Sequence, residues 1–459
     1  MFRRLLIANR GEIARRIIRG AHALGIEAVA VYSEADRDAP FVREADLAVC
    51  LGPARAAESY LDGEAILQAA AQTHSQAIHP GYGFLSENAL FAQMVLQQRL
   101  GWVGPSPSVI RAMGEKAPAK AAMRRAGLPL VPGSDGIVAN VEQAIAIAER
   151  LGYPVLLKAD AGGGGKGMRR ADDRRSLVEA WQAAEGEARA SFGSGALYLE
   201  AYLERARHIE FQILADSWGN AIHLLERECS IQRRHQKLLE EAPSVAIDEE
   251  LREKMGTRVA QAVAAVGYSG AGTVEFLLDV DRRELYFIEM NTRLQVEHPV
   301  TEEITGIDLV QAQIRVAAGE RLWLAQSDVR GTGHAIEVRI NAEDPDAGFR
   351  PTPGTITRFD MPAGALGAGR VRVDAAVESG SKIPPYYDSL VAKLIGWGPD
   401  RAAAIDVLRA ALDRSHIDGI ATTIALHKRI LAAPEFAQGD LRVGHIPSLS
   451  SPGWILGAV

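Results

Sequence analysis

The strongest constraint on the fold comes from residues 4–32, where two strand patterns flank one helical pattern. Residues 4–8 and 27–32 are short, mostly apolar runs. Between them, apolar side chains recur after Gly11 at the spacing of one helix face, at Ile13, Ile17, Ile18, Ala21 and Leu24. A strand, a helix and a second strand make a βαβ unit, and such units build parallel sheets. The chain therefore opens with an α/β domain.

The pattern changes twice further along the chain. We expect helices near residues 61–73, 115–126, 140–151, 248–266, 308–318 and 400–413. We expect further strands near residues 76–79, 101–104, 154–158, 208–214, 221–228, 272–279 and 285–291. From His334 the sequence is mostly β and rich in Gly and Pro. These changes predict α/β and α+β domains over 1–112, 113–203, 204–330 and 334–445, and a loosely structured tail over 446–459.

Composition excludes several classes of protein. The 459 residues carry a net charge of -7, which argues against nucleic-acid binding through a basic surface. The only cysteines, Cys50 and Cys229, exclude a disulfide framework and a multi-cysteine metal site. No apolar run reaches the roughly 18–20 residues of a membrane span. The N-terminus lacks the features of a signal peptide, so we expect a cytoplasmic protein without a removed leader.

A glycine-rich loop follows the expected strand at 154–158. Four consecutive glycines, 162–165, precede Lys166 and Gly167, and Lys158 ends the strand. Glycine lets backbone N–H groups approach a polyphosphate closely. A P-loop is excluded because glycine, instead of Ser or Thr, follows Lys166. The loop predicts a nucleotide lid, with a flexible hairpin tip as the alternative.

Two carboxylates face each other in a predicted hairpin. If its loop is centred on Arg282, Glu275 lies opposite Glu289, and Asn291 shares the face of Glu289. Like charges directly opposite on a sheet are destabilising, and a hard cation between them removes the conflict. Carboxylate and amide oxygens suit Mg²⁺ or Mn²⁺. The hairpin therefore predicts a metal site, with two solvated carboxylates as the alternative.

Two polar runs complete the candidate site. After Asn291, the chain offers Arg293 as an anion binder, Gln295 as a hydrogen-bond donor and Glu297 as a general base. The second run, residues 232–237, is basic and lies between apolar residues. A phosphate-facing loop and a solvated surface remain equal interpretations of it. His208 and Glu210 alternate on a predicted strand, and as isolated residues they are more often structural.

Several long runs resemble the biotin carboxylase family, a branch of the ATP-grasp superfamily. The runs lie at residues 7–14, 79–88, 163–168, 229–237, 287–300, 334–344 and 384–389, and the resemblance covers about residues 1–440. It implies an ATP-grasp fold with a Rossmann-like N-terminal domain and a β-rich C-terminal domain. Rival ATP-grasp ligases do not match runs 79–88 and 334–344, and a non-catalytic nucleotide-binding paralogue would lack some of the charged residues that are present here.

The resemblance also implies roles for particular residues. The ATP contacts would be Lys116, Lys158, Gly163, Gly164, Gly165, Lys166, Gly167, Glu200, Leu203, His208, Gln232 and His235. Glu275, Glu289 and Asn291 would hold two Mg²⁺ or Mn²⁺ ions. Bicarbonate would contact Lys237, Arg293, Gln295 and Val296, and Glu297 would deprotonate it. Arg339 would stabilise the biotin enolate, with Tyr82 and Gly83 near the biotin.

The implied enzyme is an ATP-dependent carbon–nitrogen ligase that carboxylates biotin through carboxyphosphate. The sequence has no Met-Lys biotinylation motif, so biotin would come on a separate carrier protein, with a carboxyltransferase as the second partner. We expect the first half-reaction of an acyl-CoA carboxylase, acetyl-CoA first. Propionyl-CoA, methylcrotonyl-CoA, pyruvate and urea types are alternatives. A homodimer is implied, although Ala23, like Asp160 and Ala201, departs from the family's usual residue.

Overall fold

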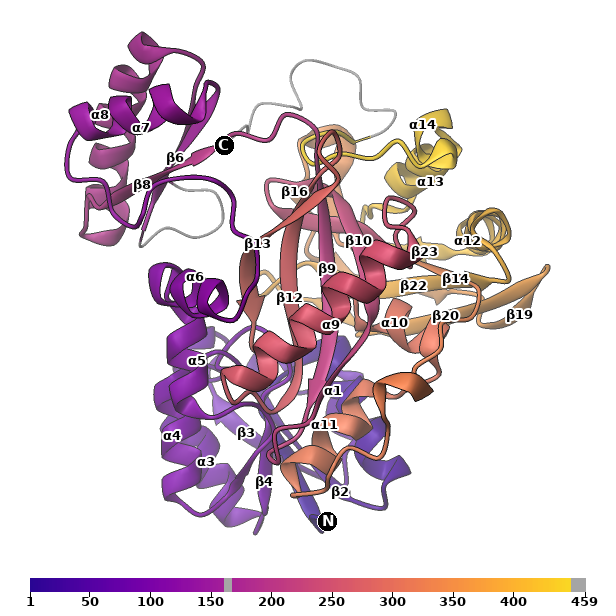
Figure 1. Cartoon of the computed structure of the whole chain (residues 1–459). Helices are drawn as coiled ribbons and strands as arrows, with labels where there is room; N and C mark the ends of the chain where they lie inside the picture. Colours follow the sequence, from indigo (N-terminus) through magenta and orange to yellow (C-terminus); the bar gives the residue numbers. More distant parts are fainter. Residues whose placement is uncertain (161–166, 447–459) are drawn as a thin grey trace.

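The first part of the protein is a five-stranded parallel sheet with helices beside it (Figure 1). A computed structural model describes residues 1–160 and 167–446. The strand order β3-β2-β1-β4-β5 places the opening strand in the middle, as the βαβ pattern predicts. The strands are β1 (Arg4–Ile7), β2 (Glu27–Ser33), β3 (Leu47–Gly52), β4 (Ala77–His79) and β5 (Gly101–Trp102). The helices are α1 (Gly11–Ala23), α2 (Pro40–Glu44), α3 (Gly63–Gln72), α4 (Ala89–Gln97), α5 (Pro107–Gly114) and α6 (Lys116–Arg125).

A small lobe stands apart at the upper left of Figure 1. Its antiparallel sheet has the order β7-β6-β8, from strands β6 (Val155–Ala159), β7 (Met168–Ala171) and β8 (Leu197–Ala201). Helices α7 (Val141–Leu151) and α8 (Arg174–Phe192) bury their apolar faces against it. The sequence did not indicate α8. Of the predicted lid, residues 162–166 lie outside the described residues, whereas the Gly167 carbonyl accepts the N–H of Ala159 at 3.0 Å.

One nine-stranded antiparallel sheet forms the centre of the rest. Its order is β13-β12-β9-β10-β11-β14-β22-β20-β19, so strands from 206–291 and from 334–398 share a single sheet. The strands are β9 (Ala206–Ala215), β10 (Ala221–Arg233), β11 (Gln236–Ala242), β12 (Gly270–Asp279), β13 (Glu284–Asn291), β14 (His334–Asn341), β19 (Gly364–Leu366), β20 (Gly369–Ala375) and β22 (Leu390–Gly398). The helices are α9 (Glu249–Ala265), α10 (His298–Thr305), α11 (Leu309–Ala317), α12 (Arg401–Arg414), α13 (Ile424–Ala432) and α14 (Pro434–Gln438).

Short elements fill the connections. Strands that form two-stranded pairs are β15 (Glu343–Asp344), β16 (Arg350–Pro351), β17 (Gly354–Thr355), β18 (Arg358–Asp360), β21 (Lys382–Ile383) and β23 (His416–Asp418). Most helices and strands that the sequence predicted are present to within a few residues, although β10 extends five residues beyond its predicted end. Besides α8, the longest described helix, the sequence did not indicate α2, α4, α10, α13, α14, β3, β8 or β11. Within residues 1–160 and 167–446, no helix combines the length and apolar character needed to cross a membrane.

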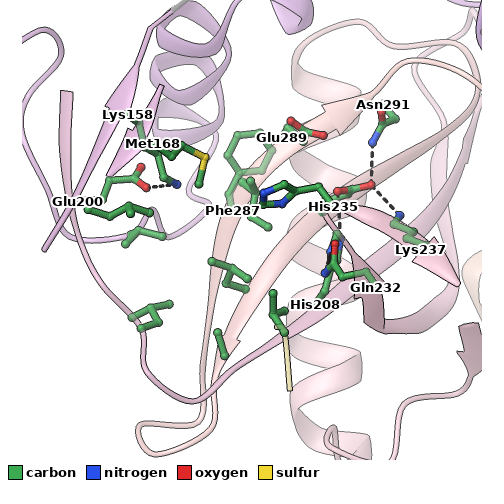
Figure 2. Close-up of a pocket in the computed structure, with 18 of the residues that line it drawn as sticks. Lys158, Met168, Glu200, His208, Gln232, His235, Lys237, Phe287, Glu289 and Asn291 are labelled. Atoms are coloured by element: carbon green, nitrogen blue, oxygen red, sulfur yellow. Dashed lines mark hydrogen bonds and ion pairs between the residues drawn. The ribbon is translucent and has the colours of Figure 1, made fainter. Parts of the chain in front are cut away.

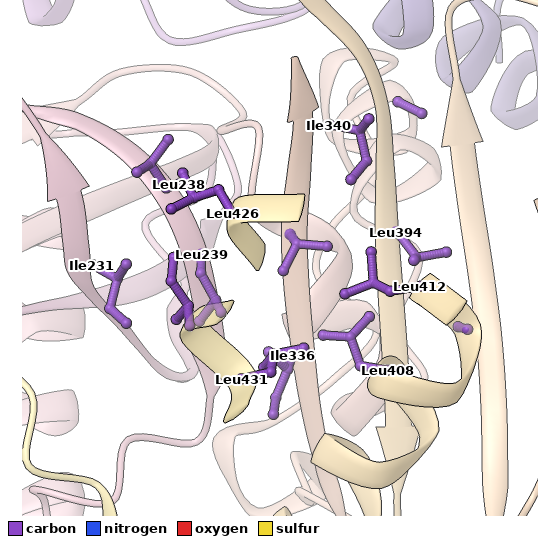
Figure 3. Close-up of a cluster of buried hydrophobic side chains, with 14 of the residues drawn as sticks. Ile231, Leu238, Leu239, Ile336, Ile340, Leu394, Leu408, Leu412, Leu426 and Leu431 are labelled. Atoms are coloured by element: carbon purple, nitrogen blue, oxygen red, sulfur yellow. The ribbon is translucent and has the colours of Figure 1, made fainter. Parts of the chain in front are cut away.

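A hydrophobic core between this sheet and helices α12 and α13 fixes the direction of β14 side chains (Figure 3). Ile336, Val338 and Ile340 face this core and are fully buried. Because side chains alternate along a strand, Glu337 and Arg339 point to the opposite side of the sheet. The packing of α12 therefore determines where the Arg339 guanidinium lies.

We predict that Leu408→Ala destabilises the protein. Leu408 of α12 is fully buried in this core, so its truncation leaves a cavity and should lower the free energy of unfolding by about 2–5 kcal/mol. Leu90→Ala is the matched control, because Leu90 is 64% exposed on α4 and should change stability by less than about 0.5 kcal/mol. Urea unfolding measures both. Equal effects would mean that the α12 packing is not as described.

Candidate active site

A cavity of about 580 Å³ lies between the small lobe and the nine-stranded sheet. Figure 2 shows Lys158 and Glu200 on its lobe side, and His208, Lys237 and Asn291 on its sheet side. It brings together most of the residues that the sequence singled out. These are Lys116, Lys158, Glu200, Leu203, His208, Gln232, His235, Lys237, Glu275, Glu289, Asn291, Arg293, Gln295, Val296, Glu297 and Arg339.

A cluster of lysines surrounds one buried carboxylate on the lobe side. Lys158 Nζ lies 2.6 Å from Glu200 Oε2, and Lys120 Nζ contacts Glu200 Oε1. Burial by itself raises the pKa of Glu200, but the charges of Lys158 and Lys120 outweigh it and lower this pKa to about 2. Burial lowers the pKa of Lys116 and of Lys120. Sequence reasoning missed Lys120, although it follows Lys116 by four residues and so shares its helix face.

The carboxylate pair lies where the hairpin predicted it. Glu275 of β12 is paired with Glu289 of β13, and Thr273 is paired with Asn291. A bulge beside this pair shifts the rest of the hairpin by one residue. The Glu289 side chain is exposed to the cavity, and its carboxylate makes no hydrogen bond or ion pair with another described residue. Although the side chain opens onto the cavity, desolvation by the surrounding protein and the charge of Glu275 raise the pKa of Glu289, against the opposing charges of His208, Lys116 and Lys237. Among the described residues, no cation is in direct contact with this carboxylate.

The basic run at 232–237 is a tight hairpin, which corrects the loop interpretation. Gln232 pairs with Lys237 across strands β10 and β11, and only Arg234 and His235 form the turn. Both turn residues have positive φ, 47° and 63°, as a two-residue type I′ turn requires. Apolar neighbours on these strands enter the core, which is why the run is strand instead of loop. The turn presents Arg234 and His235 to the cavity.

Lys237 is the centre of the charged network. Its Nζ lies 2.5 Å from Glu210 Oε2, 3.0 Å from Glu275 Oε1 and 2.6 Å from Glu297 Oε1. Burial lowers the pKa of Lys237, but the three carboxylates outweigh it and raise this pKa well above its usual value. Glu210 also accepts from the fully buried Arg227 at 2.5 Å. The sequence placed Glu210 on its strand without assigning it this role.

The predicted base contacts two cations. Glu297 Oε1 lies 2.6 Å from Lys237 Nζ, and its Oε2 lies 2.9 Å from an Arg339 nitrogen. Burial raises the pKa of Glu297, but Lys237 and Arg339 outweigh it and lower this pKa far below its usual value. Arg339 also donates to Glu240 Oε1 at 2.6 Å. Burial raises the pKa of Glu240 to about 7, although the charge of Arg339 lowers it. Glu240 was missed because a buried Glu on a strand has no sequence signature.

Arg293 and Gln295 join the same network from the segment after β13. Arg293 Nε donates to Glu87 Oε2 at 2.8 Å, and its NH2 group donates to the Asn291 amide oxygen at 3.1 Å. Gln295 Nε2 donates to Glu275 Oε1 at 2.9 Å, and its own Oε1 accepts from Lys237 at 3.2 Å. The segment therefore presents a guanidinium and an amide beside the Lys237 ammonium.

Tyr82 and Gly83 do not line this cavity. They line a separate one of about 240 Å³, together with Arg10, Glu12 and Tyr387 among others. The Tyr82 hydroxyl donates to Glu12 Oε1, so it is turned toward the N-terminus of α1. The sequence could not separate the two cavities, because it does not show how far residues 79–88 lie from residues 287–300 in the folded protein.

The arrangement suits the transfer of a phosphoryl group to a small anion. One end offers lysines for a polyphosphate, the hairpin offers an unpaired carboxylate for a metal, and Lys237 and Arg293 lie beside an ionised carboxylate. Preorganised charges of this kind stabilise charge that develops in a transition state.

Family models cover nearly the whole chain. Residues 1–110 match the biotin carboxylase N-terminal domain, and residues 337–448 match the biotin carboxylase C-terminal domain. Residues 115–325 match the ATP-binding domain of the carbamoyl-phosphate synthase L chain.

Similar proteins agree with these matches. A biotin carboxylase of Nostoc is 53% identical over 98% of this chain and 99% of its own. A pyruvate carboxylase subunit of Methanothermobacter thermautotrophicus is 51% identical over 96% of this chain and 89% of its own.

Two solved structures have the same fold. The biotin carboxylase domain dimer of Hydrogenobacter thermophilus 2-oxoglutarate carboxylase, in complex with MgADP, ADP and bicarbonate, has a TM-score of 0.90 at 51% identity and covers 96% of each chain. Campylobacter jejuni biotin carboxylase, in complex with β,γ-ATP, has a TM-score of 0.92 at 45% identity and covers 97% of this chain and 98% of its own. The expected ATP-grasp fold is therefore confirmed, and the chain belongs to the biotin carboxylases, the ATP-dependent ligases of biotin-dependent carboxylases.

Proposed function

We propose that the 580 Å³ cavity carries out ATP- and bicarbonate-dependent carboxylation of a biotin held by a separate carrier protein. One observation carries the proposal: Glu297 contacts Lys237 at 2.6 Å and Arg339 at 2.9 Å. Glu297, the base proposed for the first chemical step, is thus in contact with Arg339, the cation proposed for the second step.

The lobe side of the cavity would bind ATP, as the complexes of the two solved relatives with ADP and β,γ-ATP support. The described residues that would contact it line the cavity at Lys116, Lys158, Glu200, Leu203, His208, Gln232 and His235, and we add Lys120. Gly167 adjoins the cavity through Met168, and Gly163, Gly164, Gly165 and Lys166 lie outside the described residues. Glu200 forms ion pairs with Lys120 and Lys158 and so orients their ammonium groups. Both would therefore be in position before the phosphates bind.

The residues at the hairpin fit Mg²⁺ or Mn²⁺. Glu289 offers a carboxylate that no described cation contacts directly, and Glu275 faces it across the strands. Asn291 would also bind the metal through its amide oxygen, once the metal replaces the hydrogen bond that this oxygen accepts from Arg293. A second acidic group, His208, Glu210 and Glu275, has ligand atoms within 4.8 Å of one another, but Lys237 already supplies its positive charge. The metal would neutralise charge on phosphoryl oxygens.

The chemistry begins at Glu297. Lys237, Arg293, Gln295 and the segment at Val296 would hold bicarbonate, and Glu297 would accept its proton as a bicarbonate oxygen attacks the γ-phosphorus of ATP. The bond to the bridging oxygen of ADP breaks, and carboxyphosphate forms. Glu297 can act as this base because its carboxylate remains ionised near neutral pH.

Carboxyphosphate then breaks into CO₂ and phosphate, and this phosphate takes the N–H proton of biotin. The biotin enolate is an oxyanion that Arg339 would pair with while it attacks CO₂. When Glu297 takes up the bicarbonate proton, it loses the charge that attracts Arg339. The first step would thereby weaken one of the two contacts that hold the Arg339 guanidinium, the other being Glu240, and leave its charge available for the second step. Tyr82 and Gly83 would lie near the biotin.

The partners would be a biotin carboxyl carrier protein and a carboxyltransferase, in the cytoplasm. We propose acetyl-CoA as the final acceptor, which is the first expectation from the sequence resemblance; the name of the Nostoc relative, biotin carboxylase, specifies no acceptor. An oxo acid is the second candidate, because two relatives that are 51% identical to this chain belong to a pyruvate carboxylase and a 2-oxoglutarate carboxylase.

A homodimer is also proposed, because the Hydrogenobacter thermophilus domain is a dimer. Ala23, which departs from the family's usual residue, lies exposed at the end of α1.

ATP cleavage tests the proposed reaction directly. The purified chain should cleave ATP faster when bicarbonate and free biotin are both present, and it should form carboxybiotin. ATP cleavage that does not respond to bicarbonate would contradict the proposal.

We predict that Glu289→Gln abolishes turnover while the fold survives. The change removes the unpaired charge of the metal site, so saturating Mg²⁺ should not restore the rate. Glu284→Gln is the matched control, because Glu284 is exposed at the start of the same strand and does not line the cavity. Thermal unfolding and the rate of ATP cleavage measure both. Near-normal activity of Glu289→Gln at saturating Mg²⁺ would exclude Glu289 as a metal ligand.

We predict that Glu297→Ala and Arg339→Ala separate the two steps. Each should slow its own step by on the order of 10²-fold, because each removes a charge or a base needed there. Glu297→Ala should lose bicarbonate-dependent ATP cleavage. Arg339→Ala should lose biotin carboxylation more than ATP cleavage. Equal loss of both activities in both variants would show that the two residues do not divide the reaction.

A further inference from the structure

Lys393 is a buried lysine that joins three distant parts of the chain. It lies on β22, and its side chain is fully buried. Its Nζ donates to the Val296 carbonyl at 2.9 Å and lies 3.1 Å from Glu12 Oε1. Glu12 lies in the first turn of α1 in the N-terminal sheet domain, whereas Val296 belongs to the segment after β13. One ammonium group therefore contacts both.

These contacts connect the two cavities. Val296 lines the 580 Å³ cavity, between the side chains of Gln295 and Glu297. Glu12 and Tyr82 line the 240 Å³ cavity, and the Tyr82 hydroxyl donates to the same Glu12 oxygen that faces Lys393. A continuous path of hydrogen bonds thus runs from Tyr82 through Glu12 and Lys393 to Val296.

Stability alone is a weak reason for such a pair. A buried ion pair loses its hydration, and well-packed apolar side chains in its place are often as stable or more so. Glu12 Oε2 is buried and has no hydrogen-bond partner among the described residues, and burial raises the pKa of Glu12. The contacts place this costly charge between two segments that the proposed reaction needs together.

We propose that Lys393 is a positioning residue that holds the Val296 backbone and, through Glu12, the Tyr82 hydroxyl at a fixed separation. This rests on the proposed function, in which Val296 adjoins bicarbonate and Tyr82 adjoins biotin. A single fixed carbonyl between Gln295 and Glu297 orients both neighbouring side chains. The CO₂ released at one cavity then meets a biotin held at the other, and reactions between separate groups depend steeply on such placement.

A double-variant experiment separates this role from simple charge balance. Lys393→Met keeps most of the side-chain stem and removes the ammonium, which leaves Glu12 without its cation. Lys393→Met combined with Glu12→Gln removes both charges of this pair, so a role limited to neutralising Glu12 predicts that stability and activity recover together. Arg252→Met is the matched control, because it breaks an ion pair to the fully buried Glu226, 2.8 Å away, and neither of these two residues lines either cavity.

The measurement is the amount of carboxybiotin formed per ATP cleaved, at a temperature below the unfolding midpoint of every variant. We expect Lys393→Met and the double variant both to lower this ratio about 10-fold to 100-fold, even where the double variant regains stability. Arg252→Met should keep the wild-type ratio. A wild-type ratio in the double variant would overturn the proposal, as would an equal loss in Arg252→Met. Wild-type protein without bicarbonate-dependent ATP cleavage would instead refute the proposed function.

Discussion

The Lys237 ammonium places one positive charge among three buried carboxylates, and the site depends on it. Glu210, Glu275 and Glu297 lie within 3.0 Å of its Nζ. Without this cation the buried carboxylates would repel one another, and some would take up protons. Lys237 reaches them because the tight turn at Arg234 and His235 returns the chain directly onto β10. The strained turn is thus what positions Lys237 at the centre of the charged network.

Two carboxylates of the cavity have opposite electrostatic environments. Glu297 has two cations in contact, and its pKa falls far below the usual value. Glu289 faces the negative charge of Glu275, and its pKa rises. Pairs of titratable groups whose surroundings shift their pKa values apart commonly have different tasks in a mechanism. Here the first suits a base that stays ionised, and the second suits a ligand that awaits a cation.

The sequence predicted local features well, but it did not predict which residues far apart in the chain lie close together in the fold. The pairing of Glu275 with Glu289 followed from strand length and a short connection, because register is a local property of a hairpin. Glu240 and Lys393 carried no such signal, because the role of a buried charge on a strand can be inferred only once its contacts in the fold are known. The resemblance implies that Tyr82 lies near the biotin, which stays a prediction. The sequence could not show that Tyr82 lines a cavity of its own, because no periodicity shows how separate domains approach each other. Helix α8 was missed beside the glycine-rich loop, whose turn signals dominated that region.

The central claim is that bicarbonate attacks the γ-phosphate of ATP in this cavity and forms carboxyphosphate. Bicarbonate labelled with ¹⁸O tests it most directly, because the attacking oxygen becomes part of the released phosphate when carboxyphosphate breaks down. Mass spectrometry of that phosphate, in unlabelled water with Mg²⁺ and biotin, should find one ¹⁸O atom transferred per turnover from fully labelled bicarbonate. Phosphate that carries oxygen only from water and ATP, in reactions that form carboxybiotin, would contradict this account.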